Sequence, residues 1–116
     1  FNIDFIGVKQ EKFYLLLFDT KRNLIKKEEI FKGTIDSVNM HPREVFRTAI
    51  LEGATFIIIM HNHPSGDTTP SDKDIEATNQ FIKAGEIIGI KVVDHIIISS
   101  ENYYSFYANS LNNCIK

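Results

Sequence analysis

Cysteine is almost absent from this chain, because its 116 residues include a single cysteine, Cys114, close to the C-terminal end. One thiol excludes a disulfide framework and a zinc finger built on thiolates, and it fits a reducing compartment. The sequence also has no apolar run near the roughly 20 residues that a membrane span needs, and no signal peptide is visible. These absences favour a cytoplasmic protein that does not contact a membrane.

The chain also has no excess of basic residues over acidic ones. The net charge is -2 and the pI is near 6.1, whereas nucleic-acid binders usually carry a clustered Lys/Arg face. Direct nucleic-acid binding by this chain is therefore not expected. The length and the hydrophobic share of 43% suit one domain with one core. Since the chain begins with Phe1 rather than Met, we expect residues 1–116 to be a single domain and a C-terminal fragment of a longer protein, of open oligomeric state.

The hydrophobic pattern predicts strands that alternate with helices. Pro42 suits the first turn of one helix, and Ser71 and Gly89 suit the two ends of another. The segment leading up to residue 60 is apolar at successive positions, so both faces of that strand are expected to be covered. The expected strands are 13–19, 24–33, 54–60, 91–99 and a short one in 101–107, and the expected helices are 41–53 and 71–89. The order β-β-α-β-α-β-β predicts an α/β domain with a mixed sheet flanked by helices.

Two histidines follow the most apolar of these strands. His61 and His63 are one residue apart, and the alternation of side chains along a strand turns both to the same face. Asp74 lies eleven residues beyond His63, in the first turn of the second helix. A loop of that length can fold the helix start over the strand end and form a His-His-Asp site with a fourth position open to water. Such a ligand set is typical of catalytic zinc, so Zn²⁺ is the predicted cofactor.

Each of these residues also has a structural interpretation. An H-x-H pair at a strand end arises by chance, and an acidic Asp74 suits the positive end of a helix dipole. Ser71 and Asp74 together match the S-x-x-[DE] capping box. His95, in an apolar strand, is either a satisfied core residue or a residue that orients a metal ligand. His41 is either an ordinary residue before a helix or part of the rim of the site.

The run HNHPSGDTTPSDKD, from His61 to Asp74, resembles the JAMM motif of JAB/MPN metalloproteases, which is H-x-H-P, about seven residues, then S-x-x-D. The segments FYLLLFDTKRNLI, HPREVFRTAI and AGEIIGIKVVDHIII resemble RadC-like proteins, so that the resemblance covers about residues 11–107. It implies a JAB/MPN-type, cytidine-deaminase-like fold. It also implies a zinc-dependent hydrolase that cleaves a peptide, isopeptide or other amide bond in a peptide or protein substrate.

The same resemblance implies roles for two further residues. Glu11, just before the first strand, matches the glutamate that acts through the metal-bound water as a general base, and Glu44 is the reserve candidate. Ser71 matches the serine that hydrogen-bonds the developing oxyanion. Its hydroxyl would then serve both the helix cap and the substrate, though not both fully.

Other activities fit less well. RadC-like proteins are traditionally labelled as DNA repair proteins, so the alternative is a repair-associated module that binds DNA or a protein partner without hydrolysis. A scaffold that has lost catalysis would typically have lost its ligands. HNH nucleases spread their His, Asn and His over a longer ββα unit, and zinc deaminases need H-x-E and C-x-x-C, both of which this sequence lacks.

Overall fold

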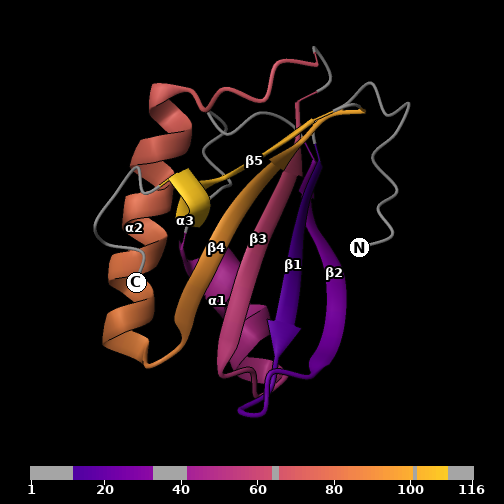
Figure 1. Cartoon of the computed structure of the whole chain (residues 1–116). Helices are drawn as coiled ribbons and strands as arrows, with labels where there is room; N and C mark the ends of the chain where they lie inside the picture. Colours follow the sequence, from indigo (N-terminus) through magenta and orange to yellow (C-terminus); the bar gives the residue numbers. More distant parts are fainter. Residues whose placement is uncertain (1–11, 33–41, 64–65, 101, 110–116) are drawn as a thin grey trace.

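A single mixed sheet with helices packed on it forms the described part of the chain (Figure 1). The computed structural model describes residues 12–32, 42–63, 66–100 and 102–109. Their elements are β1 (Lys12–Phe18), β2 (Leu24–Lys32), α1 (Pro42–Leu51), β3 (Phe56–Asn62), α2 (Asp72–Ile88), β4 (Lys91–Ile98), β5 (Tyr103–Ser105) and α3 (Phe106–Asn109). The strand order is β2-β1-β3-β4-β5, and among these strands only β3 and β4 run parallel. The predicted fold class and the order of the main elements are confirmed.

The end of the described chain differs from the prediction. The last strand, expected over 101–107, stops at Ser105, and the chain continues as the short helix α3. The Ser105 hydroxyl accepts the N–H of Ala108 at 3.1 Å, and the Asp94 carboxylate accepts the N–H of Tyr107 at 3.0 Å. These bonds satisfy N–H groups that have no partner within a first helical turn, and so they favour a helix over the extended chain that the aromatic pattern predicted.

The hairpin of β1 and β2 lies at one edge of the sheet. The two strands are antiparallel, and β2 has no further strand beside it in the described chain. Its middle is charged and exposed, with Lys26 Nζ lying 3.0 Å from Glu28 Oε1 and 3.3 Å from Glu52 Oε2. The predicted hairpin and its charged edge strand are therefore confirmed.

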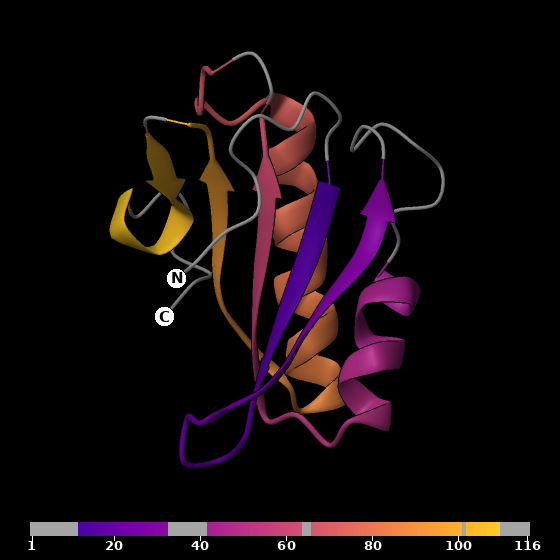
Figure 2. The same ribbon diagram turned by 90° about the vertical axis from the view of Figure 1, so that its right-hand side faces the viewer.

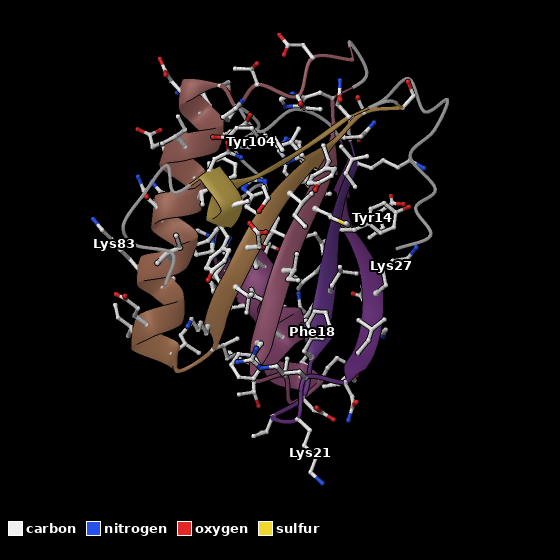
Figure 3. All side chains as sticks on the ribbon, in the orientation of Figure 1. Tyr14, Phe18, Lys21, Lys27, Lys83 and Tyr104 are labelled. Atoms are coloured by element: carbon white, nitrogen blue, oxygen red, sulfur yellow. The ribbon has the colours of Figure 1, made fainter. Side chains whose placement is uncertain are left out.

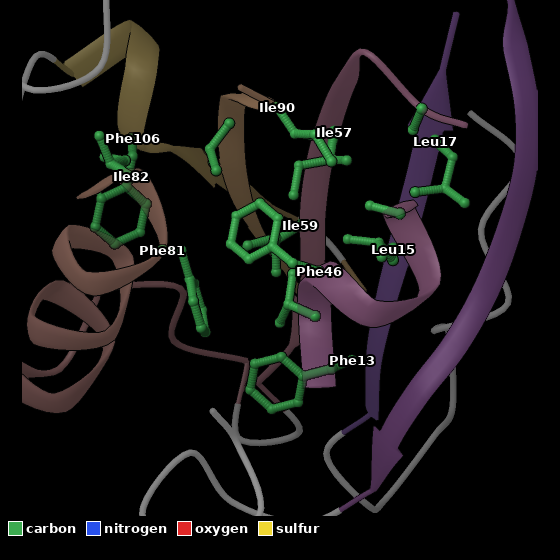
Figure 4. Packing of buried hydrophobic residues seen from close by; sticks show 14 of the residues in the cluster. Phe13, Leu15, Leu17, Phe46, Ile57, Ile59, Phe81, Ile82, Ile90 and Phe106 are labelled. Carbon is green, nitrogen blue, oxygen red and sulfur yellow. The ribbon is translucent and has the colours of Figure 1, made fainter. Parts of the chain in front are cut away.

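The main apolar core lies between the sheet and one layer made of α1 and α2 (Figure 2). Phe46 from α1 and Phe81 from α2 meet Phe13 and Ile59 of the sheet, and all four side chains are at most 2% exposed (Figure 4). Full burial of a side chain of this size contributes about 1.5–3 kcal/mol to the free energy of unfolding. This packing fixes both helices against the strands.

The opposite face of the sheet is covered less completely. Leu16 and Met60 are buried there, and half-buried Tyr14, Phe18 and Ile58 surround them (Figure 3). The expectation that both faces of β3 are covered therefore holds fully on the helix side and in part on this side.

Helix α2 is fixed at both of its ends. The Ser71 hydroxyl accepts the N–H of Asp74, and the Asp74 carboxylate accepts the N–H of Ser71, which together form the predicted capping box. Gly89 ends the helix with φ of 91°, the left-handed conformation that glycine adopts most readily. A Cβ at Gly85 would lie 2.3 Å from the Ile90 carbonyl oxygen, so only glycine permits this approach of helix to strand. None of the described helices combines the length and the apolar character needed to cross a membrane.

The carboxyl ends of the parallel strands and the start of α2 meet at one end of the sheet (Figure 1). In the register of the sheet, His61 lies between Phe13 of β1 and Ile97 of β4. The Asn62 side chain accepts the N–H of Lys12 at 2.6 Å and so ties the start of β1 to the same place. Chain segments far apart in sequence thus converge on the two histidines.

Candidate metal centre

His61 and His63 turn toward each other at the end of β3. Strand geometry brings their Nε2 atoms within 3.1 Å, as the alternation predicted. His61 is completely buried, and its ring stacks on Phe13 with centroids 4.5 Å apart. His63 lies just beyond the strand. Its backbone N–H donates to the Ile98 carbonyl at 2.9 Å, and its side chain is 15% exposed. The pair therefore has one buried and one more accessible member.

Asp74 completes this group from the first turn of α2. Its Oδ1 lies 3.5 Å from His61 Nε2, and its Oδ2 lies 3.3 Å from His63 Nε2. The residue is 1% exposed, and the Ser71 N–H donates to its Oδ2 at 2.9 Å. Ligand atoms of the three side chains all lie within 4.8 Å of one another. His61, His63 and Asp74 are thus positioned to bind a metal ion, as the sequence predicted.

A hydrogen bond of the His63 ring shows which of its two nitrogens faces the other two candidate ligands, His61 and Asp74. Its Nδ1 lies 2.8 Å from the backbone carbonyl oxygen of Asp67. A carbonyl oxygen only accepts, so Nδ1 carries a proton, and in the neutral ring Nε2 presents its lone pair to His61 and Asp74. The loop is closed by the Gly66 N–H, which donates to the His63 carbonyl at 3.0 Å, and by the Asp67 carboxylate, which accepts the Thr69 N–H at 3.0 Å. The Nε2 atom of His63 is thus the nitrogen that can coordinate a cation.

The charge states of the group suit a divalent cation. Burial alone would raise the pKa of the Asp74 carboxyl, but the imidazoles of His63 and His61 close to it, together with the Ser71 N–H, outweigh burial and lower the pKa to about 2. Burial, together with the neighbouring His95, holds the pKa of His61 well below its ordinary value. At neutral pH the centre thus offers an ionised carboxylate and unprotonated imidazole nitrogens. Two imidazoles and one carboxylate form a set of ligands that proteins use to bind divalent metal ions.

His95 lies directly behind His61. Its Nε2 is 2.8 Å from His61 Nδ1, and its Nδ1 is 2.6 Å from the Thr78 hydroxyl oxygen. The ring is completely buried and stacks on Phe106, with centroids 4.9 Å apart and 10° between the planes. His95 is therefore a satisfied core residue, as one interpretation of the sequence predicted, and it also contacts His61. Thr78 was missed in the sequence, although its spacing of four residues from Asp74 places it on the same face of α2.

The remaining predicted site residues have different outcomes. Glu11 and His41 lie outside the described residues. Glu44 is exposed in the first turn of α1, where its Oε2 lies 3.4 Å from Arg43 Nε, and it is not one of the clustered ligands. Ser71 is exposed at the start of α2. Its hydroxyl oxygen accepts the Asp74 N–H, and accepting a hydrogen bond does not use the hydroxyl proton, so the cap and a bond to substrate are compatible.

The buried His95 makes the metal-free protein sensitive to acid. Burial lowers the pKa of His95 to about 4, from an ordinary value of 6.5. The unfolded chain therefore binds a proton near pH 6.5 that the folded chain binds only near pH 4, so stability is lost as the pH falls through this window. We expect a loss of roughly 3 kcal/mol in the free energy of unfolding between pH 7 and pH 4 from this residue, measured by urea denaturation in EDTA. His95→Gln should make the profile less steep, with the part that is due to buried His61 remaining, and an equally steep profile in that variant would contradict the assignment to His95.

Comparison with known proteins agrees with these observations. A family model described as "RadC-like JAB domain" matches residues 2–111. A UPF0758 protein of Finegoldia magna is 55% identical over 95 residues, which are 82% of this chain and 43% of the relative. A UPF0758 protein of Staphylococcus haemolyticus is 52% identical over 96 residues, or 83% of this chain and 42% of the relative. The chain thus spans less than half the length of these relatives. With a family match over nearly its whole length, the chain belongs to the family of RadC-like JAB domains.

Proposed function

We propose that this domain is a zinc-dependent hydrolase of the JAMM type that cleaves a peptide, isopeptide or other amide bond. The observation that carries the proposal is the convergence of His61 Nε2, His63 Nε2 and the Asp74 carboxylate within 3.1–3.5 Å of one another. At least one imidazole lone pair faces the carboxylate there. Because both groups are electron-rich, a cation between them would stabilise the arrangement. When bound, Zn²⁺ supplies a Lewis acid and lowers the pKa of a water ligand towards ~7.

Residues of the chain would carry out proton transfer and stabilise the developing oxyanion. Glu11 takes a proton from the attacking water and passes it to the leaving amine, which makes it the general base and then the general acid. The Ser71 hydroxyl donates a hydrogen bond to the carbonyl oxygen as negative charge develops on it. We expect a peptide or protein substrate to reach the centre from the side of His63, because His63 is the more exposed ligand. A reducing cytosol is the proposed compartment, since the chain has a single cysteine.

The test is the zinc content of tag-free protein, followed by a substrate screen. We expect about one zinc per chain by elemental analysis, because one group of three ligands is present among the described residues. A screen of peptides and isopeptide-linked conjugates should then give a cleavage that stops on removal of zinc with a chelator and resumes when zinc is added back. Protein that stays metal-free after zinc is supplied would contradict the proposal and leave a partner-binding role.

A further inference from the structure

A chain of three hydrogen bonds connects the two ligand-bearing elements behind the metal position. The Thr78 hydroxyl donates to the Asp74 carbonyl at 2.7 Å and lies 2.6 Å from His95 Nδ1, and His95 Nε2 lies 2.8 Å from His61 Nδ1. We propose that Thr78 and His95 are positioning residues that hold His61 in the tautomer with its Nε2 lone pair aimed at the metal position. The inference rests on the proposed metal function for its purpose, but its geometry is a property of the metal-free chain.

The direction of every bond follows from one fixed acceptor. The Asp74 carbonyl oxygen can only accept, so the Thr78 hydroxyl proton is used there. The Thr78 oxygen must then accept the proton on His95 Nδ1. A neutral His95 with its proton on Nδ1 has a lone pair on Nε2, which accepts the proton on His61 Nδ1. His61 Nε2 is left without a proton and faces His63 and Asp74.

Burial makes the reverse direction unfavourable. His61, Thr78 and His95 are all 0% exposed, so bulk water cannot replace a lost partner. If the Thr78 hydroxyl donated to His95 instead, two oxygen lone pairs would face each other over the 2.7 Å to the Asp74 carbonyl. This repulsion favours the direction in which the Thr78 hydroxyl donates to the Asp74 carbonyl.

Aromatic packing holds the two rings in place. Phe13 stacks on His61 at 4.5 Å between centroids, and Phe106 stacks on His95 at 4.9 Å. The backbone N–H of His95 also donates to the Asp94 carboxylate at 2.7 Å. Neither imidazole can therefore turn over without displacing a stacked phenylalanine, and the hydrogen-bond chain acts on rings whose orientation is already set.

The two histidine ligands are thus oriented by different means. His63 uses the Asp67 backbone carbonyl in a surface loop, which no side-chain substitution removes. His61 uses the side chains of His95 and Thr78, and these end at the backbone of Asp74, itself a ligand. The β3 and α2 ligands are coupled through β4, so a change at Thr78 is transmitted to the metal position without touching a ligand.

Thr78→Val is the sharpest test, because it removes the hydroxyl and keeps the shape. His95 Nδ1 then has no acceptor, so His95 is expected to move its proton to Nε2 and donate to His61 Nδ1. That change forces the His61 proton onto Nε2, against the metal position. We expect ¹⁵N shifts of the histidine rings in metal-free protein at pH 8 to show His61 and His95 protonated on Nδ1 in the wild type. Both should be protonated on Nε2 in Thr78→Val, with zinc affinity lowered about 10–100-fold in chelator competition.

Two further variants separate the possible causes. Thr78→Ser keeps a hydroxyl and should restore the wild-type ring shifts and zinc affinity. Thr48→Val, on α1, applies the same substitution away from the centre and should change neither. An Nε2 proton on His61 in the metal-free wild type would overturn the inference even if Thr78→Val fails to fold. Wild-type ring shifts as expected, in a protein that binds no zinc or cleaves no amide, would count against the proposed function alone.

Discussion

Loss of zinc binding with retention of the fold is expected when His63 or Asp74 is replaced. The two side chains meet at 3.3 Å, and each supplies one of three ligands, so His63→Ala and Asp74→Asn each remove a direct metal contact. Loss of a partner behind a ligand typically lowers metal affinity 10–100-fold, and loss of the ligand itself should exceed roughly 100-fold. Chelator competition and elemental analysis would measure the change, and circular dichroism would report the fold.

Substitutions beside the ligands provide matched controls. Asp72 is also acidic, lies in the first turn of α2 and is exposed, so Asp72→Ala should bind zinc as the wild type does. Ser71→Ala removes the helix cap that Asp74 shares, at a cost of about 1 kcal/mol in stability, and keeps the carboxylate. It should therefore retain zinc. One zinc per chain in both His63→Ala and Asp74→Asn would show that the metal binds elsewhere.

The ligand group could be predicted from the sequence because its geometry is local. Alternation in β3 places His61 and His63 on one side, and a capped helix places Asp74 in its first turn. The loop between them is short enough that strand end and helix start must lie close together. The resemblance to a known motif then selected this interpretation over an ordinary capping box, although the structure has both.

His95 could be predicted as a core residue or as a residue that orients a ligand, but its contact with His61 could not, because that contact depends on register. His95 is 34 residues from His61 and meets it only through the parallel pairing of β3 with β4. Strict alternation from buried Val92 would turn Asp94 toward the core, but an irregularity in this pairing shifts the register and buries His95 instead. Asp94 then faces the other way, where it accepts from Ser105 and Tyr107. No periodicity in the sequence indicates where such a shift occurs.

Glu11→Gln is expected to abolish hydrolysis while zinc stays bound. The substitution keeps the size of the side chain and removes its ability to take a proton from water. General acid–base catalysis typically contributes about 10²–10⁴-fold to a rate, so kcat should fall by that factor. Glu11 directly precedes Lys12 in the sequence. The backbone N–H of Lys12 donates to the side chain of Asn62, the residue between the two histidine ligands in the sequence. The measurement is kcat on the best substrate of the screen, with zinc content determined on the same sample.

Glu44→Gln is the comparison that decides the assignment. Glu44 is exposed on α1 beside Arg43, and removal of its charge there should leave both zinc content and kcat near wild type. A strong loss of kcat in this variant, with a fully active Glu11→Gln, would move the general base to Glu44. Loss in neither would exclude both carboxylates. Glutamine cannot take up a proton as glutamate does. If the wild type, Glu11→Gln and Glu44→Gln contain equal amounts of zinc, a fall in kcat can therefore be assigned to the loss of proton transfer rather than to the loss of metal.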